Sequence, residues 1–331
     1  MDHKAVFFHV EHAGKGGDAY LAASEKLKAA GVEVVCVETV LDKNDIPTDL
    51  AITSADIIGV FVESAVDANV IAAFPNLKMI ATLTTGYDHI DLAAAAARGI
   101  VVSSVPAYGE NTVAEFAFAL ILALSRKVIP CCERLHDEHL FTNDGLQGFD
   151  LAGKTIGVVG TGRIGKHAIE MAKGFSMNVI AYDVYHDDAF AAKMGFPYVE
   201  LDALLAQSDI ITIHAPYLPS THHLINSGNI GKVKPGAYII NTARGAIVET
   251  AALVGALKSG QLGGAGLDVL EEEGMMKSGD MSPIADLVTM PNVIVTPHNA
   301  FNTREAFQRI LDTTIDNIAG FAAGTPQNVV K

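Results

Sequence analysis

The sequence is poor in cysteine, in basic residues and in long hydrophobic runs. Its 331 residues include three cysteines, Cys36, Cys131 and Cys132. Three cysteines cannot all pair, and adjacent cysteines seldom bridge each other, so a reducing compartment such as the cytoplasm is expected. None of the three has the C-x-x-C or C-x-x-H spacing of a metal site, and no bound metal is expected.

The charge balance is acidic, with a formal net charge of −15 and a pI near 5.1. Nucleic-acid binding requires a basic surface, so no nucleic-acid partner is expected, and an acidic membrane surface is disfavoured on the same ground. The longest apolar stretch, near residues 116–124, is too short to span a bilayer. Residues 1–5 lead directly into a predicted strand rather than into a signal peptide. These features predict an acidic cytoplasmic protein with no membrane partner.

What the sequence does contain is a glycine-rich turn near its middle, at Gly160–Gly165, with the sequence GTGRIG. A β-branched strand signal at 155–159 precedes it, and a predicted helix at 167–175 follows. A second strand signal at 178–182 ends at Asp183, which lies 18 residues after the last glycine. A glycine cluster alone would be weak evidence, but a strand, turn, helix, strand and acid in this order are typical of a dinucleotide-binding unit.

Each part of this unit has a physical reason. The first glycine allows the tight turn, the second lets a pyrophosphate approach the backbone, and the third lets the helix pack on the strand. The start of the helix offers free N–H groups to the phosphates. Asp183 would accept hydrogen bonds from both ribose hydroxyls and repel a 2′-phosphate, and no arginine follows it, so NAD is expected rather than NADP. The cofactor residues of this unit are Gly160, Gly162, Arg163, Ile164, Gly165 and Asp183.

Strand and helix signals alternate along the chain, which predicts parallel sheets. Before the turn, strands are predicted at 5–10, 32–37, 57–62, 77–82 and 100–103, and helices at 18–30, 66–73 and 92–98. From the turn region onward, strands are predicted at 155–159, 178–182, 210–214, 237–241, 264–269 and 293–295, and helices at 167–175, 201–207, 249–259 and 303–321. The segments 132–150 and 271–281 are predicted to be loops.

A long helix is predicted from Asn111, its expected N-cap, to about Lys127. Its apolar positions include Ala114, Ala117, Leu120, Ile121 and Leu124. Because apolar side chains nearly encircle this helix, we expect it to be buried, and we expect a homodimer to form through it.

The central position of the glycine turn predicts how the domains are threaded. One α/β domain precedes the turn, and a helix follows the last strand of the cofactor domain. If that helix returns to the first domain, the chain crosses between domains twice, and a ligand cleft between them is expected. The predicted domains are a substrate domain of residues 1–103 and 300–331 and an NAD-binding domain of residues 104–299.

Three polar residues follow strand signals in the second half of the chain, Arg244, Glu273 and His298. Ligands of open α/β sheets collect at the carboxyl ends of strands, so these residues could face one crevice. An arginine can hold a carboxylate with two hydrogen bonds, and a histidine can donate a proton near neutral pH. Taken alone, Arg244 could equally cap a helix, and His298 is one of twelve histidines. Spacing does not decide which acid of Glu271–Glu273 points inward.

Seven motifs make the chain similar to the D-isomer-specific 2-hydroxyacid dehydrogenases, especially their D-lactate dehydrogenase branch. They occur in the family's order and extend over about two thirds of the chain. The motifs are TTGYDHID at 84–91, VPAYGENTVAE at 105–115, GTGRIG at 160–165, Tyr182-Asp183, NTARG at 241–245, GLDVLEEEG at 266–274 and VTPHNAFNT at 295–303. The resemblance implies a Rossmann NAD-binding domain inserted in a flavodoxin-like substrate domain, both doubly wound parallel-sheet α/β structures.

The resemblance also implies roles for individual residues. Arg244 would bind the substrate carboxylate and polarise its carbonyl, His298 would donate and accept the proton, and Glu273, five residues after the aspartate of the LDV motif, would pair with His298. Asp268 would lie at the nicotinamide carboxamide. Further implied cofactor contacts are Ala215, Pro216, Thr221, Thr242, Ala243 and Arg244. Implied substrate contacts are the backbone of Thr85 and Gly86, the side chains of Tyr108 and Phe301, and Arg244.

The implied reaction is reduction of a small 2-keto acid, with pyruvate as the first candidate, to the D-2-hydroxy acid by hydride transfer from NADH. Glyoxylate, hydroxypyruvate or phosphite are alternative substrates, and an NAD-sensing scaffold similar to the superfamily's corepressors is an alternative of another class. Formate is disfavoured because formate dehydrogenases of this superfamily carry an amide at the position of Glu273. The phosphoglycerate branch is disfavoured because its extra C-terminal regulatory domain is not found here. Leu83, in place of a basic residue, and Asn302, in place of a tyrosine, depart from the family pattern.

Overall fold

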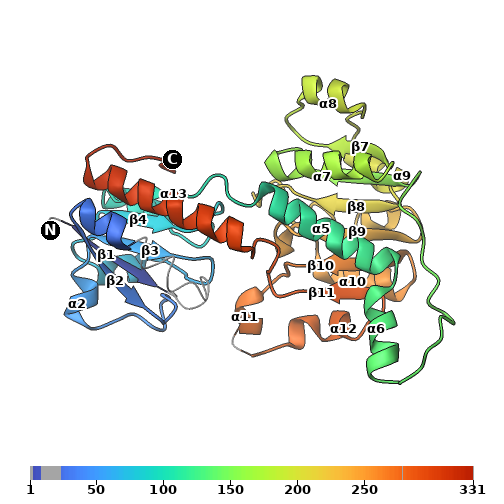
Figure 1. Cartoon of the computed structure of the whole chain (residues 1–331), viewed down its shortest axis with the longest axis horizontal. Helices are drawn as coiled ribbons and strands as arrows, with labels where there is room; N and C mark the ends of the chain where they lie inside the picture. Colours follow the sequence, from blue (N-terminus) through green and yellow to red (C-terminus); the bar gives the residue numbers. More distant parts are fainter. Residues whose placement is uncertain (1–2, 9–23, 278, 331) are drawn as a thin grey trace. The chain divides into compact units, whose positions relative to one another are not determined.

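The computed structural model describes residues 3–8, 24–277 and 279–330. Contacts divide the chain into two compact units (Figure 1). Unit 1 combines Met1–Tyr108 with Asn302–Lys331, and unit 2 is Gly109–Phe301. The predicted boundaries after residues 103 and 299 lie a few residues from these divisions. Each unit has its own sheet and its own hydrophobic core.

The sheet of unit 1 has five parallel strands in the order β2-β1-β3-β4-β5. In chain order the strands are β1 (His3–Phe8), β2 (Val32–Val37), β3 (Ile57–Val60), β4 (Met79–Thr82) and β5 (Val101–Ser103). This order, 2-1-3-4-5, is that of flavodoxin-like folds. The strands occupy the predicted positions, although β3 ends earlier than predicted, and residues 9–10 of the first predicted strand lie outside the described residues.

The helices of unit 1 begin at side chains that accept hydrogen bonds from free backbone N–H groups. Asp49, Asp67, Asp91 and Thr303 cap their helices in this way. The helices are α2 (Leu50–Thr53), α3 (Ala68–Ala73), α4 (Leu92–Ala97) and α13 (Arg304–Ala322). Of the predicted helix 18–30, residues 24–29 are helical and residues 18–23 lie outside the described residues. The last helix of the chain, α13, packs on β4 within unit 1 (Figure 1).

The sheet of unit 2 has six parallel strands in the order β11-β10-β9-β8-β6-β7. They are β6 (Thr155–Val159), β7 (Asn178–Tyr182), β8 (Ile210–Ile213), β9 (Ala237–Asn241), β10 (Leu262–Leu267) and β11 (Val293–Val295). A parallel bridge from Ala181 to Tyr198 adds a short extended segment beside β7. With that segment as third strand, the order becomes 3-2-1-4-5-6-7, which is the Rossmann order 3-2-1-4-5-6 with β11 as one further strand. The predicted fold class of two parallel α/β sheets is confirmed.

Helices cover both faces of the unit 2 sheet. On one face α5 (Glu110–Ser125) and α7 (Arg163–Gly174) share a core with β6 and β7. On the other face α9 (Leu201–Gln207) and α10 (Thr250–Lys258) share a core with β8, β9 and β10. The remaining helical elements are α6 (Val128–His136), α8 (Asp188–Met194), α11 (Glu273–Lys277), α12 (Ala285–Val288) and the short η1 (Ile230–Lys232), η2 (Gly245–Ile247) and η3 (Ser282–Ile284).

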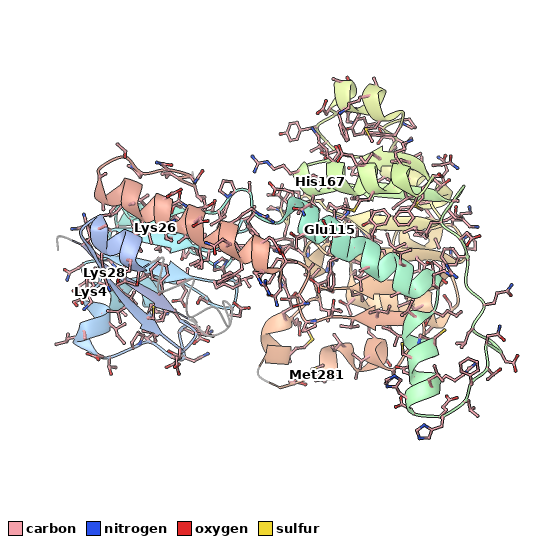
Figure 2. All side chains as sticks on the ribbon, in the orientation of Figure 1. Lys4, Lys26, Lys28, Glu115, His167 and Met281 are labelled. Atoms are coloured by element: carbon pink, nitrogen blue, oxygen red, sulfur yellow. The ribbon has the colours of Figure 1, made fainter. Side chains whose placement is uncertain are left out.

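Several predicted details of unit 2 are wrong. Gly109, rather than Asn111, is the N-cap of α5, and the Asn111 amide instead donates to the exposed Glu115 at 3.0 Å (Figure 2). Helix α7 begins four residues before the predicted start, directly after Gly162, because the glycine turn itself forms its N-terminus. The predicted loops contain α6 and α11. Lys127, with a left-handed φ of 52°, is the break that separates α6 from α5.

Candidate active site

The glycine turn lies where the strand order of unit 2 reverses. The chain leaves β6 toward β7 on one side, while β8 pairs with β6 on the other. Gly160 has a φ of 90°, and a Cβ there would lie 2.6 Å from the backbone nitrogen of Ala215, just after β8. Ala215 itself is buried. The two loops are therefore packed together at the point where open α/β sheets bind their ligands.

The three glycines of the turn differ in what surrounds them. A Cβ at Gly165 would lie 2.0 Å from the carbonyl oxygen of Gly160, so only glycine fits there. A Cβ at Gly162 would meet nothing within 4 Å, and this open space lies at the N-terminus of the twelve-residue helix α7. Open backbone beside free helical N–H groups is what a pyrophosphate requires, so these residues fit NAD. Ile164 packs into the core below the turn, and Arg163 lies 3.8 Å from Glu110.

Asp183 is held against this turn. Its Oδ2 accepts hydrogen bonds from the Thr161 backbone N–H at 2.6 Å and from the Thr161 hydroxyl at 3.1 Å. Its Oδ1 accepts from the Tyr185 N–H at 3.0 Å. Asp183 is half-buried, and Val184 and Tyr185 beside it are exposed. The acid predicted from spacing is thus an ordered acceptor beside the predicted phosphate site.

The loop after β8 is closed by one threonine. The Thr221 hydroxyl donates to the Pro216 carbonyl at 2.7 Å and accepts from the Leu218 N–H at 2.7 Å. The predicted cofactor contacts Pro216 and Thr221 are therefore neighbours in space. Ala215, the third predicted contact in this loop, is the residue that faces Gly160.

The loop after β9 carries Arg244. Its backbone is fixed by the Asn241 side chain, whose amide donates to the Arg244 carbonyl at 2.9 Å and whose oxygen accepts from the Ala243 N–H at 3.0 Å. Thr242 is buried, while Ala243 and Arg244 are partly exposed. A Cβ on Gly245 would lie 1.9 Å from the carbonyl carbon of Leu270. This glycine therefore lets the β9 loop pack directly on the β10 loop.

Asp268, at the end of β10, holds the loop that carries His298. Its buried carboxylate accepts hydrogen bonds from the Thr296 hydroxyl at 2.5 Å, the Asn299 N–H at 2.8 Å and the Ala300 N–H at 2.8 Å, and its carbonyl accepts from the His298 N–H at 2.8 Å. These bonds fix the backbone on both sides of the histidine. The sequence pattern did not reveal this anchoring, because it links residues 28 or more positions apart.

His298 and Glu273 form a hydrogen-bonded pair. Nδ1 of His298 lies 3.0 Å from Oε2 of Glu273, and both side chains keep some exposure to solvent. His298 has a φ of 52°, a left-handed conformation that is costly for a non-glycine residue and that the surrounding bonds must hold. An ionised carboxylate only accepts, so Nδ1–H donates to Glu273 and Nε2 is left to face a ligand.

The structure separates the three consecutive acids that spacing could not distinguish. Glu271 accepts from His223 at 2.6 Å and from the Thr250 N–H at 2.7 Å. Burial acts to raise the pKa of Glu271, but the hydrogen bonds from Thr250 and His223 outweigh it and lower the pKa. Glu272 is exposed with a φ of 59°, and Glu273 is the acid at His298. Arg244, Glu273 and His298 therefore follow the neighbouring strands β9, β10 and β11 at one edge of the sheet.

The remaining predicted substrate residues belong to both units. In unit 1, the Thr85 hydroxyl donates to the Val105 carbonyl at 2.7 Å, and the Thr84 hydroxyl donates to the Gly86 carbonyl at 2.5 Å, so this turn is fixed. Tyr108 ends the first segment of unit 1. Phe301 ends unit 2, with its ring centroid 6.3 Å from that of His298. The two departures from the family pattern, Leu83 and Asn302, lie in unit 1, and Leu83 is buried.

One buried polar residue of unit 2 was not singled out from sequence. His214 directly follows β8 beside Gly160, and its Nε2 lies 2.9 Å from the Thr212 hydroxyl. Burial lowers the pKa of His214 to about 4, so the ring is neutral at physiological pH. Its Nδ1 has no hydrogen-bond partner among the described residues. Within the described ranges, no group of three His, Cys, Asp or Glu side chains could hold a metal ion, and no helix could cross a membrane.

The NAD-binding domain model of the D-isomer-specific 2-hydroxyacid dehydrogenases matches residues 118–300, which is most of unit 2. The chain belongs to this family. Its members are NAD-dependent oxidoreductases that act on a CH–OH group, so the predicted family, enzyme class and cofactor are confirmed. Among relatives, a glycerate dehydrogenase of Methylorubrum extorquens is 40% identical over 269 residues, covering 80% of this chain and 82% of that protein. A D-lactate dehydrogenase of Curvularia clavata is 41% identical over 281 residues, covering 82% and 80%.

Solved structures show the same similarity for this dehydrogenase. The pyruvate reductase of Chlamydomonas reinhardtii has a TM-score of 0.87 at 38% identity, covering 98% of this chain and 97% of that one. The D-lactate dehydrogenase of Aquifex aeolicus, solved with NAD and lactic acid, has a TM-score of 0.86 at 34% identity, covering 97% and 96%.

Proposed function

We propose that this dehydrogenase reduces a small 2-keto acid, with pyruvate as the first candidate, to the D-2-hydroxy acid. The observation that carries the proposal is the 3.0 Å pair of His298 Nδ1 and Glu273 Oε2 at the carboxyl end of the NAD-binding sheet. A histidine that is oriented by a carboxylate and keeps Nε2 free is the arrangement of a general acid. The pyruvate reductase and the D-lactate dehydrogenase among the similar structures support pyruvate.

In the proposed reaction the chain's own residues bind the acid and supply the proton. Bound NADH supplies the hydride from its reduced nicotinamide. The Arg244 guanidinium holds the substrate carboxylate with two hydrogen bonds and polarises the keto group. As the hydride adds to the keto carbon, the C=O electron pair moves to oxygen, and that oxygen takes the proton from Nε2 of His298. Glu273 favours the cationic ring because an adjacent negative charge stabilises it.

A second substrate has specific support. The Methylorubrum extorquens relative is a glycerate dehydrogenase, and the keto acid that corresponds to glycerate is hydroxypyruvate. Hydroxypyruvate differs from pyruvate by one hydroxyl group. A hydrophobic pocket discriminates against an added hydroxyl by only roughly 10²-fold. The two substrates are therefore compared by their measured values of kcat/KM.

We expect NADH oxidation, followed by absorbance, to be fastest with pyruvate in a panel that also contains hydroxypyruvate, glyoxylate and a branched 2-keto acid. Phosphite is tested in the opposite direction, with NAD. A higher kcat/KM with hydroxypyruvate would replace pyruvate by the second candidate. Tight NADH binding without turnover of any keto acid would contradict the proposed reaction and favour an NAD-sensing scaffold.

We further propose a homodimer that forms through a surface other than the predicted helix. Most of the apolar side chains of α5 are buried within unit 2 itself. The exposed large apolar side chains follow it, on α6 and the segment after it, at Val128, Ile129, Leu135, Leu140 and Phe141, of which Phe141 is 96% exposed. A monomer rarely exposes such a cluster, so a second copy of this chain is its proposed partner.

Light scattering should therefore give the mass of a dimer, and Phe141→Asp combined with Leu140→Asp should shift the population toward monomer. Leu50→Asp is the matched control, because Leu50 is 81% exposed on α2 in unit 1. A stable monomer for the unmodified chain at working concentration would contradict the dimer.

The three cysteines are free thiols, which supports the proposed cytoplasmic location.

A further inference from the structure

Tyr198 lies outside every family motif, yet it contacts the residues that hold Asp183. Its backbone forms the third-strand position of the Rossmann sheet, where the Val199 N–H donates to the Ala181 carbonyl at 2.8 Å and the Ala181 N–H donates to the Pro197 carbonyl at 3.1 Å. The sheet therefore sets the position of the Tyr198 side chain. Its phenol oxygen lies 2.9 Å from the Thr161 hydroxyl in the glycine turn.

The direction of the hydrogen bonds along this chain of groups follows from the donors present. The Asp187 backbone N–H can only donate, and it donates to the Tyr198 phenol oxygen at 3.1 Å. The Thr161 hydroxyl gives its one hydrogen to the Asp183 carboxylate, which can only accept. The Tyr198 O–H therefore donates to Thr161. The sequence of donation runs from Asp187 N–H through Tyr198 and Thr161 to Oδ2 of Asp183.

This arrangement determines which oxygen of Asp183 remains for a ligand. A carboxylate has about four acceptor positions, two on each oxygen. Oδ2 accepts two hydrogen bonds from Thr161, and Oδ1 accepts one from Tyr185. One acceptor position is left, on Oδ1. The sequence predicts that Asp183 accepts hydrogen bonds from both ribose hydroxyls, whereas the carboxylate has one acceptor position open.

The surroundings of Tyr198 hold it in place. The His186 ring stacks on Tyr198 with centroids 4.0 Å apart and planes 1° from parallel, and its Nε2 lies 3.1 Å from the Asp183 carbonyl. Lys166 is engaged by Asp187 at 2.5 Å. Because Lys166 is paired with Asp187, it does not offset the charge of the Asp183 carboxylate. A 2′-phosphate would meet a fixed anion here.

We propose that Tyr198 is a positioning residue that fixes the Asp183 carboxylate through Thr161 and so sets the preference for NADH over NADPH. The proposal rests on the proposed role of Asp183 at the adenosine ribose. Without the phenol hydroxyl, Thr161 no longer has a donor that orients it, and the carboxylate can rotate. Rotation weakens the bond to the ribose and moves the negative charge from the place where it excludes a phosphate.

The test is direct binding of NADH and NADPH without any keto acid, followed by the fluorescence of the reduced nicotinamide. The chain contains no tryptophan, so no indole emission overlaps the excitation region. Tyr198→Phe should raise the Kd for NADH by about three- to tenfold, the range for loss of one hydrogen-bond link, and leave that for NADPH unchanged or lower. With saturating NADH, kcat should stay within about twofold of the unmodified enzyme, because the reacting atoms are not touched.

Variants of Thr161 separate positioning from packing. Thr161→Val, which removes the hydroxyl, should lower the affinity for NADH as Tyr198→Phe does, and Thr161→Ser, which keeps the hydroxyl, should not. The double variant Tyr198→Phe with Thr161→Val should lose no more NADH affinity than either single variant, because both substitutions break the same chain of hydrogen bonds. Tyr238→Phe is the matched control, since it removes the phenol hydroxyl of a partly buried tyrosine on β9 whose ring packs on Phe149 rather than on the glycine turn.

Unchanged NADH affinity in both Tyr198→Phe and Thr161→Val would overturn the proposal, and so would additive losses in the double variant. If Tyr198→Phe fails to fold, an unchanged NADH affinity in Thr161→Val still overturns the proposal, because the effect of Tyr198 on Asp183 runs through the Thr161 hydroxyl. Since no keto acid is present, these outcomes are independent of whether the proposed reaction is correct.

Discussion

Replacing His298 by alanine should lower kcat for keto-acid reduction by about 10²- to 10⁴-fold, which is the contribution of a positioned general acid. The ring lies at the end of β11, and its Nδ1 donates to Glu273 at 3.0 Å, so only Nε2 is available to the substrate oxygen. Steady-state NADH oxidation at saturating pyruvate measures the loss. The Kd for NADH should change little, because the glycine turn and Asp183 are untouched.

The matched control for this variant is His167→Ala. His167 lies on α7, is partly exposed, and pairs with Glu170 at 3.5 Å (Figure 2). Its removal should leave kcat within about twofold, as is usual for an exposed side chain with one weak ion pair. Near-normal turnover of His298→Ala would show that another group supplies the proton, and the assignment of His298 would be wrong.

Replacing Arg244 by alanine should lower kcat by about 10²- to 10³-fold and raise KM for the keto acid, because the guanidinium is proposed to act both on the substrate carboxylate and on the developing negative charge. Arg244→Lys should recover part of KM and little of kcat, since an ammonium group lacks the planar fork that binds a carboxylate. The split between kcat and KM is read from saturation curves for pyruvate.

Arg126→Ala is the control for Arg244→Ala, because Arg126 is an exposed residue at the C-terminus of α5. An Arg244→Ala enzyme with unchanged kcat and a raised KM would show that Arg244 binds the substrate without stabilising the transition state. Unchanged values of both kcat and KM would contradict the assignment of Arg244.

The cofactor unit could be predicted from sequence because its determinants are local. Gly160 turns the chain with a φ of 90°, Gly165 packs against the Gly160 carbonyl within the same turn, and Asp183 directly follows the next strand. The strands of both sheets were predicted for the same reason, since buried parallel strands are continuous apolar runs. The helices α6 and α11 were missed because they are only nine and five residues long and lie in or beside polar segments, so their sequences did not distinguish them from loops.

The parts that could not be predicted depend on contacts between distant residues. Glu271 and Glu273 are equivalent in spacing, and only their partners His223 and His298 distinguish them. The resemblance to the family selected Glu273, but the residues alone did not. The role of Tyr198 could not be predicted for a similar reason. Its contact with Thr161 depends on the pairing of the Tyr198 segment with β7.

We propose that unit 2 carries a proton donor and a carboxylate-binding arginine for the NADH-dependent reduction of a keto acid to one enantiomer. The most direct measurement is the configuration of the product formed from pyruvate and NADH, determined by chiral chromatography. We predict D-lactate alone, in amounts equal to the NADH consumed, and none with His298→Ala on the same time scale. Formation of L-lactate, or NADH consumption without lactate, would contradict the account.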